Sequence, residues 1–268
     1  MIKLFENVPF LQKDYNNIEN LDAPSINEYI IGDANHRLPT ILVVPGGGYV
    51  RKSDAEGEPF AKWLNDNGYN AFVLNYRVFP YNYPVPLIDI IRAIKYIKYY
   101  SAQFGVDVNN IGVMGFSAGA HLCSLLGETV KIDSFYKTND KIDEMTFDVS
   151  FCILCYPVIS MEKKYRHEGS YKAFLPNIKS NYYINKLSTY KHIGANFPKT
   201  FIWHTKEDNS VPYYNSVLFV DRLKELGIYH EFYLYEKGAH GLKFALDVPG
   251  TKEWSLRCLE FIKKVINK

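Results

Sequence analysis

The sequence Gly-Phe-Ser-Ala-Gly at residues 115–119 decides the fold, because it lies where a strand pattern changes to a helix pattern. A short apolar run at residues 111–114 precedes it, and a helix-compatible stretch at residues 120–126 follows it. A serine on so sharp a turn has a strained backbone, and flanking glycines leave room for strand and helix to approach. In this context the sequence predicts a nucleophile elbow. Without partners elsewhere it would be an ordinary glycine-rich turn with a spectator serine.

Strand and helix patterns alternate along the rest of the chain. Continuous apolar runs predict buried strands at residues 40–44, 71–76, 151–156, 200–204 and 231–235. Helical spacing predicts helices at residues 58–67, from 86 onward, 216–226 and 251–266. A strand at residues 26–31 is expected to form an edge hairpin with the segment that follows it. The alternation predicts a single α/β domain over residues 1–268, with a mostly parallel sheet and helices on both faces.

Residues 157–198 form an unusually long connection with no strong pattern between two predicted strands. A connection of this length indicates a functional, cap-like insertion after the sixth strand. From Val158 to Pro198 it carries seven basic side chains against two acidic ones, a net charge of +5. A solvated basic face explains this excess, and a preference for acidic substrates stays open.

Composition excludes several classes of function for this 268-residue chain. The net charge of +2 is too small to indicate a nucleic-acid partner, and no apolar run approaches the roughly 18 residues of a membrane span. The N-terminal residues lack a signal-peptide pattern, so we expect a cytoplasmic protein. No second cysteine pair supports a zinc site, so no metal is predicted and buried thiols are expected at Cys123, Cys152, Cys155 and Cys258.

A serine hydroxyl needs a histidine base to take its proton, and in this kind of sheet the expected chain order is serine, acid, histidine. His240 follows the last predicted strand, and small neighbours at residues 238–241 leave its ring free to approach Ser117. His204 closes a strand and is expected to be a satisfied core histidine. We therefore assign His240 as the base.

The acid should lie in the loop after the preceding strand, at residues 205–212. This loop offers two adjacent carboxylates, Glu207 and Asp208. The shorter Asp side chain orients an imidazole more rigidly, so Asp208 is assigned as the acid and Glu207 as a solvated neighbour.

An ester hydrolase also needs backbone amides that bind the developing oxyanion. The amide of Ala118 follows the serine directly. The glycine run at residues 46–48 ends an earlier strand, and its backbone can approach a ligand closely. We assign Gly47, Gly48 and Ala118 to the oxyanion hole.

With these motifs the chain resembles the α/β-hydrolase esterase/lipase family, and within it the acetyl esterases and acetylxylan-esterase-like enzymes. The resemblance rests on Pro-Gly-Gly-Gly-Tyr at 45–49, Asn-Tyr-Arg-Val at 75–78, the extended elbow at 115–122, residues 204–212 and Gly-Ala-His-Gly at 238–241. It implies an α/β-hydrolase fold with about eight strands, no cofactor, and a triad of Ser117, His240 and Asp208.

One departure from many relatives is Pro45, where they have a histidine before the three glycines. His121, one turn after Ser117, is expected to take over the task of holding the glycine loop by a hydrogen bond. Arg77 and Asp89 look like a structural ion pair.

The predicted function is that of a serine esterase that removes short acyl groups, acetyl above all, from acetylated sugars or oligosaccharides through an acyl-enzyme. Tyr49 and His167 are the candidate substrate-binding residues. The expected partner is a small ester, with neither nucleic acid nor membrane, and a homo-oligomer stays open. The alternatives are a peptidase of the prolyl-oligopeptidase type and a hydrolase fold retained as a binding protein.

Overall fold

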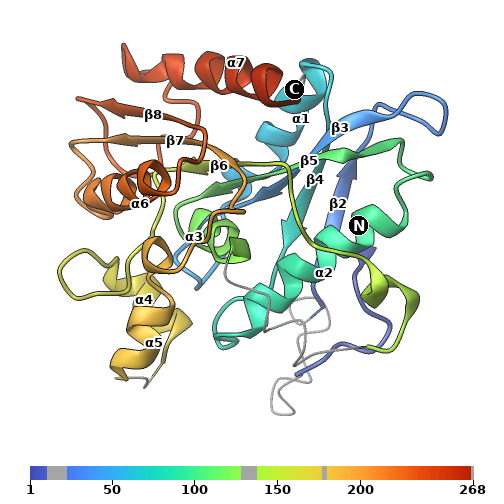
Figure 1. Cartoon of the computed structure of the whole chain (residues 1–268), viewed down its shortest axis with the longest axis horizontal. Coiled ribbons are helices and arrows are strands. Elements are labelled where there is room, and N and C mark those ends of the chain that lie inside the picture. The colour runs from blue at the N-terminus through green and yellow to red at the C-terminus, as the bar shows by residue number, and fades with distance from the viewer. Residues whose placement is uncertain (11–22, 128–137, 177–179, 267–268) are drawn as a thin grey trace.

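One eight-stranded sheet organises the protein in the computed structural model, which describes residues 1–10, 23–127, 138–176 and 180–266 (Figure 1). The strand order is β1-β2-β4-β3-β5-β6-β7-β8. The strands are β1 (Ile2–Lys3), β2 (Ser25–Tyr29), β3 (Leu38–Val44), β4 (Asn70–Asn75), β5 (Val106–Phe116), β6 (Phe151–Cys155), β7 (Lys199–Thr205) and β8 (His230–Tyr235). The α-helices are α1 (Glu58–Asp66), α2 (Val85–Tyr99), α3 (Ala118–Ser124), α4 (Glu168–Phe174), α5 (Asn181–Lys186), α6 (Tyr214–Glu225) and α7 (Trp254–Ile266).

The six strands β4-β3-β5-β6-β7-β8 are parallel to one another. At the edge beyond β4, β2 pairs antiparallel with β4, and β1 pairs antiparallel with β2. The expectation of a hairpin between the first long strand and the next segment is wrong. Strand β2 pairs with β4, with Ser25 opposite Asn75, while β3 lies on the other side of β4. Helix α1 carries the chain across from β3 to β4, so the edge left for β2 is that of β4.

Two apolar cores lie on opposite faces of the sheet, which explains the continuous apolar runs of its strands. Along β3, Leu42 and Val44 face one core, and Ile41 and Val43 face the other. Helices α2, α3 and α6 cover the first face, and α1 and α7 cover the second (Figure 1). The predicted α/β architecture is therefore confirmed.

The insertion after β6 packs into the first core. It contains helices α4 and α5, which lie next to each other beside α3 in Figure 1. Its buried side chains include Val158, Ile159, Met161, Phe174, Leu175 and Leu187. Residues 177–179 of the predicted insertion, and parts of the predicted domain 1–268, lie outside the described residues.

A buried ion pair fixes the loop that follows β4. Arg77 Nη2 lies 2.6 Å from Asp89 Oδ1 on α2, and both side chains are fully buried. The Arg77 backbone N–H also donates to Asp89 Oδ2 at 2.8 Å. The expected structural ion pair is confirmed. Two residues later, the Phe79 N–H donates to the Tyr49 carbonyl, which joins this loop to the segment after β3.

The four cysteines are free and buried, as expected of core residues. Among the described residues, none of the helices combines the length and apolar character that a membrane span requires.

Candidate active site

Ser117 lies on the turn between β5 and α3 with φ of 52° and ψ of −115°, a strained conformation for a residue with a side chain. The glycines beside it are required by close approaches. A Cβ on Gly115 would lie 2.5 Å from Ala120 Cα, and one on Gly119 would lie 2.2 Å from the Val44 carbonyl oxygen. The steric reason expected for this motif is therefore confirmed: only glycine lets α3 pack this closely on β5 and β3.

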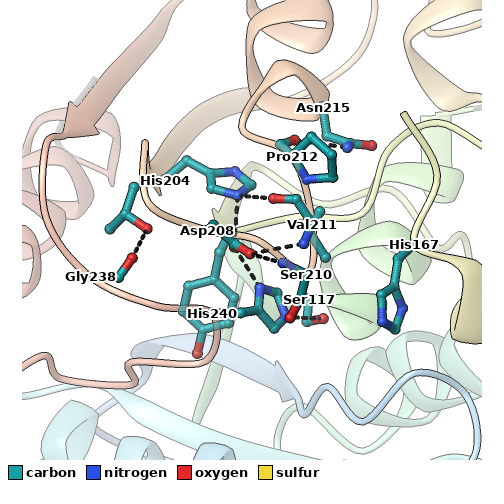
Figure 2. Close-up of polar contacts among 12 residues, drawn as sticks. Ser117, His167, His204, Asp208, Ser210, Val211, Pro212, Asn215, Gly238 and His240 are labelled. Atoms are coloured by element: carbon teal, nitrogen blue, oxygen red, sulfur yellow. Dashed lines mark hydrogen bonds and ion pairs between the residues drawn. The ribbon is translucent and has the colours of Figure 1, made fainter. Parts of the chain in front are cut away.

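Three loops at the carboxyl ends of parallel strands bring Ser117, His240 and Asp208 together (Figure 2). His240 Nε2 lies 2.8 Å from Ser117 Oγ, and His240 Nδ1 lies 2.6 Å from Asp208 Oδ2. An ionised carboxylate only accepts hydrogen bonds, so Nδ1 carries the proton of the neutral ring. The lone pair on Nε2 then accepts the serine hydroxyl, which is the arrangement that activates a nucleophile.

Asp208 is held as a carboxylate by four donors. Its Oδ1 accepts the N–H groups of Ser210 and Val211 at 3.0 and 2.8 Å, and its Oδ2 accepts His204 Nε2 at 3.0 Å in addition to His240. Burial raises the pKa of Asp208, but the hydrogen bonds from His204 and His240 outweigh it and hold the pKa well below its ordinary value. The group is therefore ionised at neutral pH.

The neighbouring carboxylate is solvated, as expected. Glu207 pairs with Lys237 at 2.7 Å and accepts the N–H of Gly238, and both charged side chains are exposed. Glu207 makes no hydrogen bond with His240 within the described residues.

The glycine loop presents backbone N–H groups beside the serine. Gly47 and Gly48 have φ of 126° and 67°, and both line a cavity of about 480 Å³ together with Ser117 and His240. Within the described residues, no hydrogen bond is made by the N–H groups of Gly47, Gly48 or Ala118. The positive φ values of the two glycines explain the preference for glycine here.

A buried carboxylate that sequence reasoning missed supports this loop. Glu56 Oε2 accepts the Gly46 N–H at 2.9 Å, and Glu56 Oε1 accepts the Tyr156 hydroxyl at 2.7 Å. Glu56 ends a short 3₁₀ turn (Asp54–Glu56) and lines the cavity. No sequence signal distinguishes it from the other acidic residues of its polar surroundings, since its partner at position 156 is 100 residues away.

His121 is fully buried and lies between the glycine loop and the insertion. Its Nε2 is 2.8 Å from the Leu187 carbonyl, which only accepts, so Nε2 carries the proton. Its Nδ1 then accepts the Tyr49 hydroxyl at 2.8 Å. Burial lowers the pKa of His121 to about 4, so the ring is neutral. His121 was expected to hold the glycine loop by a hydrogen bond; its partner is instead the side chain of Tyr49, the residue directly after the loop.

The same contacts contradict the assignment of Tyr49 as a substrate-binding residue. Its ring is fully buried and stacks on Phe174 with centroids 4.3 Å apart, and its hydroxyl is bound to His121. The side chain does not line the cavity around Ser117. The reason is that the chain turns after Gly48 and directs this residue into the core.

His167, the other candidate substrate-binding residue, does line the cavity. It caps the N-terminus of α4, where the Ser170 N–H donates to its Nδ1 at 3.2 Å. The neutral ring therefore carries its proton on Nε2. The His167 ring lies nearly parallel to that of His240, with centroids 6.5 Å apart. Burial and the neighbouring His240 lower the pKa of His167, which keeps it neutral.

In the described part of the chain, no group of three or more His, Cys, Asp or Glu residues is placed to hold a metal ion.

The family model for BD-FAE matches residues 28–223, which is most of the chain. The chain belongs to the BD-FAE family. The structure is similar to the crystal structure of an acetyl ester-xyloside bifunctional hydrolase from Caldicellulosiruptor lactoaceticus, with 39% identity and a TM-score of 0.90 over 99% of this chain and 96% of that one. The expected resemblance to the esterase branch of the α/β-hydrolases and the predicted fold are thus confirmed.

Two curated relatives of this BD-FAE member are longer proteins. Endo-1,4-beta-xylanase B of Butyrivibrio fibrisolvens is 34% identical over 92% of this chain and 39% of its own length. Acetylxylan esterase of Xylanibacter ruminicola is 30% identical over 76% of this chain and 41% of its own length. The chain spans about two fifths of the length of these curated relatives.

Proposed function

We propose that this BD-FAE protein is a serine carboxylic ester hydrolase that removes acetyl and other short acyl groups from sugars or oligosaccharides. The observation that carries the proposal is the continuous path from Ser117 Oγ to His240 Nε2 at 2.8 Å and from His240 Nδ1 to Asp208 Oδ2 at 2.6 Å. Ser117 and His240 line a cavity that Gly47 and Gly48 also line.

Acylation begins when Ser117 Oγ attacks the carbonyl carbon of the ester while His240 Nε2 takes the hydroxyl proton. The carbonyl oxygen becomes an oxyanion, and the N–H groups of Gly47, Gly48 and Ala118 bind it. His240 then gives its proton to the leaving alcohol, and the bond between acyl carbon and alcohol oxygen breaks. Asp208 stays ionised and stabilises the imidazolium that exists between these steps.

Deacylation repeats the sequence with water in place of the alcohol. His240 Nε2 takes a proton from water, and the hydroxide oxygen bonds to the acyl carbon. The ester bond to Ser117 Oγ breaks, and the serine recovers its proton from His240. The products are acetate and free Ser117.

His167 supports a substrate that carries acceptor oxygens next to the ester. Its tautomer leaves Nε2–H as the donor on the cavity side, opposite His240. A vicinal hydroxyl or ring oxygen of a sugar is such an acceptor, whereas a simple alkyl alcohol has none. Two similar proteins are named acetylxylan esterase and acetyl ester-xyloside bifunctional hydrolase. These names refer to acetyl esters and to sugars, which supports the same substrate class for this chain.

The test is a panel of p-nitrophenyl esters of rising chain length together with acetylated xylo-oligosaccharides, run with the wild type and Ser117→Ala. We expect cleavage of acetate in preference to longer acyl chains, acetate release from the oligosaccharides, and no turnover by the variant. Preferential cleavage of aminoacyl-anilides would favour the peptidase. Absence of turnover on every ester would favour a binding protein.

The remaining assignments also stay proposals. The described residues contribute to one sheet, which supports a single hydrolase domain. Four free, buried thiols support a reducing compartment such as the cytoplasm.

A further inference from the structure

A second imidazole, that of His204 on β7, is bound to the acid of the triad (Figure 2). His204 is fully buried. Its Nε2 lies 3.0 Å from Asp208 Oδ2 and 3.0 Å from the Val211 carbonyl oxygen, and its Nδ1 lies 2.8 Å from Ser216 Oγ on α6. The sequence predicts a satisfied core histidine here, and these contacts give it a specific partner.

The three contacts fix which nitrogen of His204 carries the proton. A carbonyl oxygen and an ionised carboxylate only accept hydrogen bonds, so Nε2 is the donor to both Val211 and Asp208. Nδ1 then has the lone pair and accepts the Ser216 hydroxyl. Burial lowers the pKa of His204 more than the neighbouring Asp208 raises it, so the ring is neutral.

One carboxylate oxygen therefore receives two imidazole N–H groups. Asp208 Oδ2 accepts from His240 at 2.6 Å and from His204 at 3.0 Å. The second donor has two consequences. It holds Oδ2 at the position that His240 needs, and it draws negative charge from the oxygen that stabilises the His240 imidazolium.

We propose that His204 is a positioning residue of the triad, whose Nε2–H holds Asp208 Oδ2 where the Nδ1–H of His240 needs its acceptor. The proposal rests on the proposed function, because it takes Asp208 and His240 as acid and base. It predicts that loss of the His204 donor leaves more negative charge on Asp208 Oδ2 and moves the acid limb of kcat/KM to higher pH.

Within the described residues, Asp208 is the charged group that hydrogen-bonds to His240, and other groups pack on the ring or line its cavity. Tyr156, after β6, lies edge-on to the ring at 5.1 Å, and burial and Glu56 raise its pKa so far that it stays neutral. His167, before α4, faces the ring and is neutral, since burial and His240 lower its pKa. The charged side chains that line the same cavity are Glu56, Arg51 and Lys243.

The experiment compares pH profiles of kcat/KM on p-nitrophenyl acetate for His204→Leu and His204→Gln. His204→Leu removes the donor, and we expect kcat/KM to fall about tenfold to a hundredfold, the range of a hydrogen bond to a charged group. Its acid limb should move up by about half a unit or more. His204→Gln keeps an N–H donor and should recover much of both effects.

The matched control is His230→Gln on the neighbouring strand. In the part of the chain that the structure describes, His230 Nδ1 hydrogen-bonds to the Ile228 carbonyl at the start of β8, whereas the triad lies at the carboxyl ends of the strands. We expect the wild-type profile. A folded His204→Leu enzyme with the wild-type acid limb would overturn the proposal, and so would an equal shift in His230→Gln.

A second measurement needs neither activity nor the leucine variant. Imidazole nitrogen-15 spectra of the wild type should show His204 protonated at Nε2 and bare at Nδ1, unchanged from about pH 5 to pH 8. Resonances are assigned by single replacement of each other histidine. A His204 ring that is protonated at Nδ1, or that titrates in this range, contradicts the proposal even if every ester test fails.

Discussion

At the residue scale, the orientation of His240 in the candidate site depends on Asp208, a carboxylate that can only accept hydrogen bonds. Asp208 accepts from two backbone amides and two imidazoles, and no contact asks it to donate. Replacing it by Asn puts an NH₂ group where two donors point. His240 would then turn or change its tautomer, because its Nδ1–H would lose the acceptor.

We therefore expect Asp208→Asn to lower kcat by roughly 10⁴-fold, the loss that a wrong tautomer causes in a Ser-His-Asp triad. Glu207→Gln, next in the chain, should stay within about twofold of wild type, because Glu207 is exposed and contacts only Lys237 and Gly238. Steady-state kinetics on p-nitrophenyl acetate distinguish the two. The reverse ranking would move the acid to Glu207.

His121 gives the protein a pH-dependent stability. Its pKa is lowered from the ordinary 6.5 to about 4 in the folded state, chiefly by burial. Between these pH values the unfolded chain binds a proton at this histidine and the folded protein does not. The contribution of neutral His121 to the free energy of unfolding is therefore fully present above about pH 6.5 and is lost as the pH falls toward 4. A shift of this size corresponds to about 3 kcal/mol. Urea unfolding at a series of pH values should show this loss, and His121→Gln should show a shallower one.

At the scale of single elements, α3 and β3 approach each other through glycine. Gly119→Ala would place a methyl group 2.2 Å from the Val44 carbonyl oxygen, a backbone atom that moves only with its strand. We expect a loss of stability of about 3 kcal/mol or more, measured as the free energy of unfolding in urea. Gly194→Ala meets nothing within 4 Å and should change stability by less than about 0.5 kcal/mol. Equal effects of the two variants would contradict the close-packing argument.

Elements with a strong period were predictable, because one buried face imposes its spacing on the sequence. Helix α2 and strand β3 follow this rule. Helices α4 and α5 were not recognised, since each has seven residues or fewer and buries too few positions to show a period. The predicted pairing of β2 was wrong, because the partner of this edge strand depends on where α1 carries the chain between β3 and β4.

The same distinction applies to the site. Ser117, Asp208 and His240 each follow a strand, and the chemistry that joins them has a known chain order, so the sequence places all three. Glu56 and His204 were missed as supports because their partners are set by tertiary contact. Tyr49 was wrongly assigned, because the neighbouring residues in the sequence do not determine which way a side chain points after a glycine turn.

At the scale of the whole molecule, the Arg77–Asp89 pair connects distant parts of the chain. Arg77 bonds to α2 through Asp89 and to the N-terminal segment through the Pro9 carbonyl, at 2.5 Å from its Nη1. Asp89→Asn would leave the guanidinium buried without a counter-charge. We expect a cost of about 3–5 kcal/mol in the free energy of unfolding.

The double replacement Arg77→Met with Asp89→Leu removes both charges at once. It should be less destabilising than Asp89→Asn alone, because no uncompensated charge remains in the core. Thermal and urea unfolding of the two variants measure the difference. A double variant that is the less stable of the two would show that the pair stabilises the fold by attraction rather than by mutual neutralisation.

The contacts of His121 limit how the specificity of the proposed esterase can be re-engineered. Leu187 of the insertion accepts its Nε2–H, Phe174 of the insertion stacks on Tyr49, and Tyr49 follows the glycines of the oxyanion site. The insertion and the glycine loop are thus connected through His121 and Tyr49. A chimera that imports the insertion of another hydrolase would disturb the reaction centre along with the substrate range, so variation by point substitution around His167 is the route that leaves the chemistry intact.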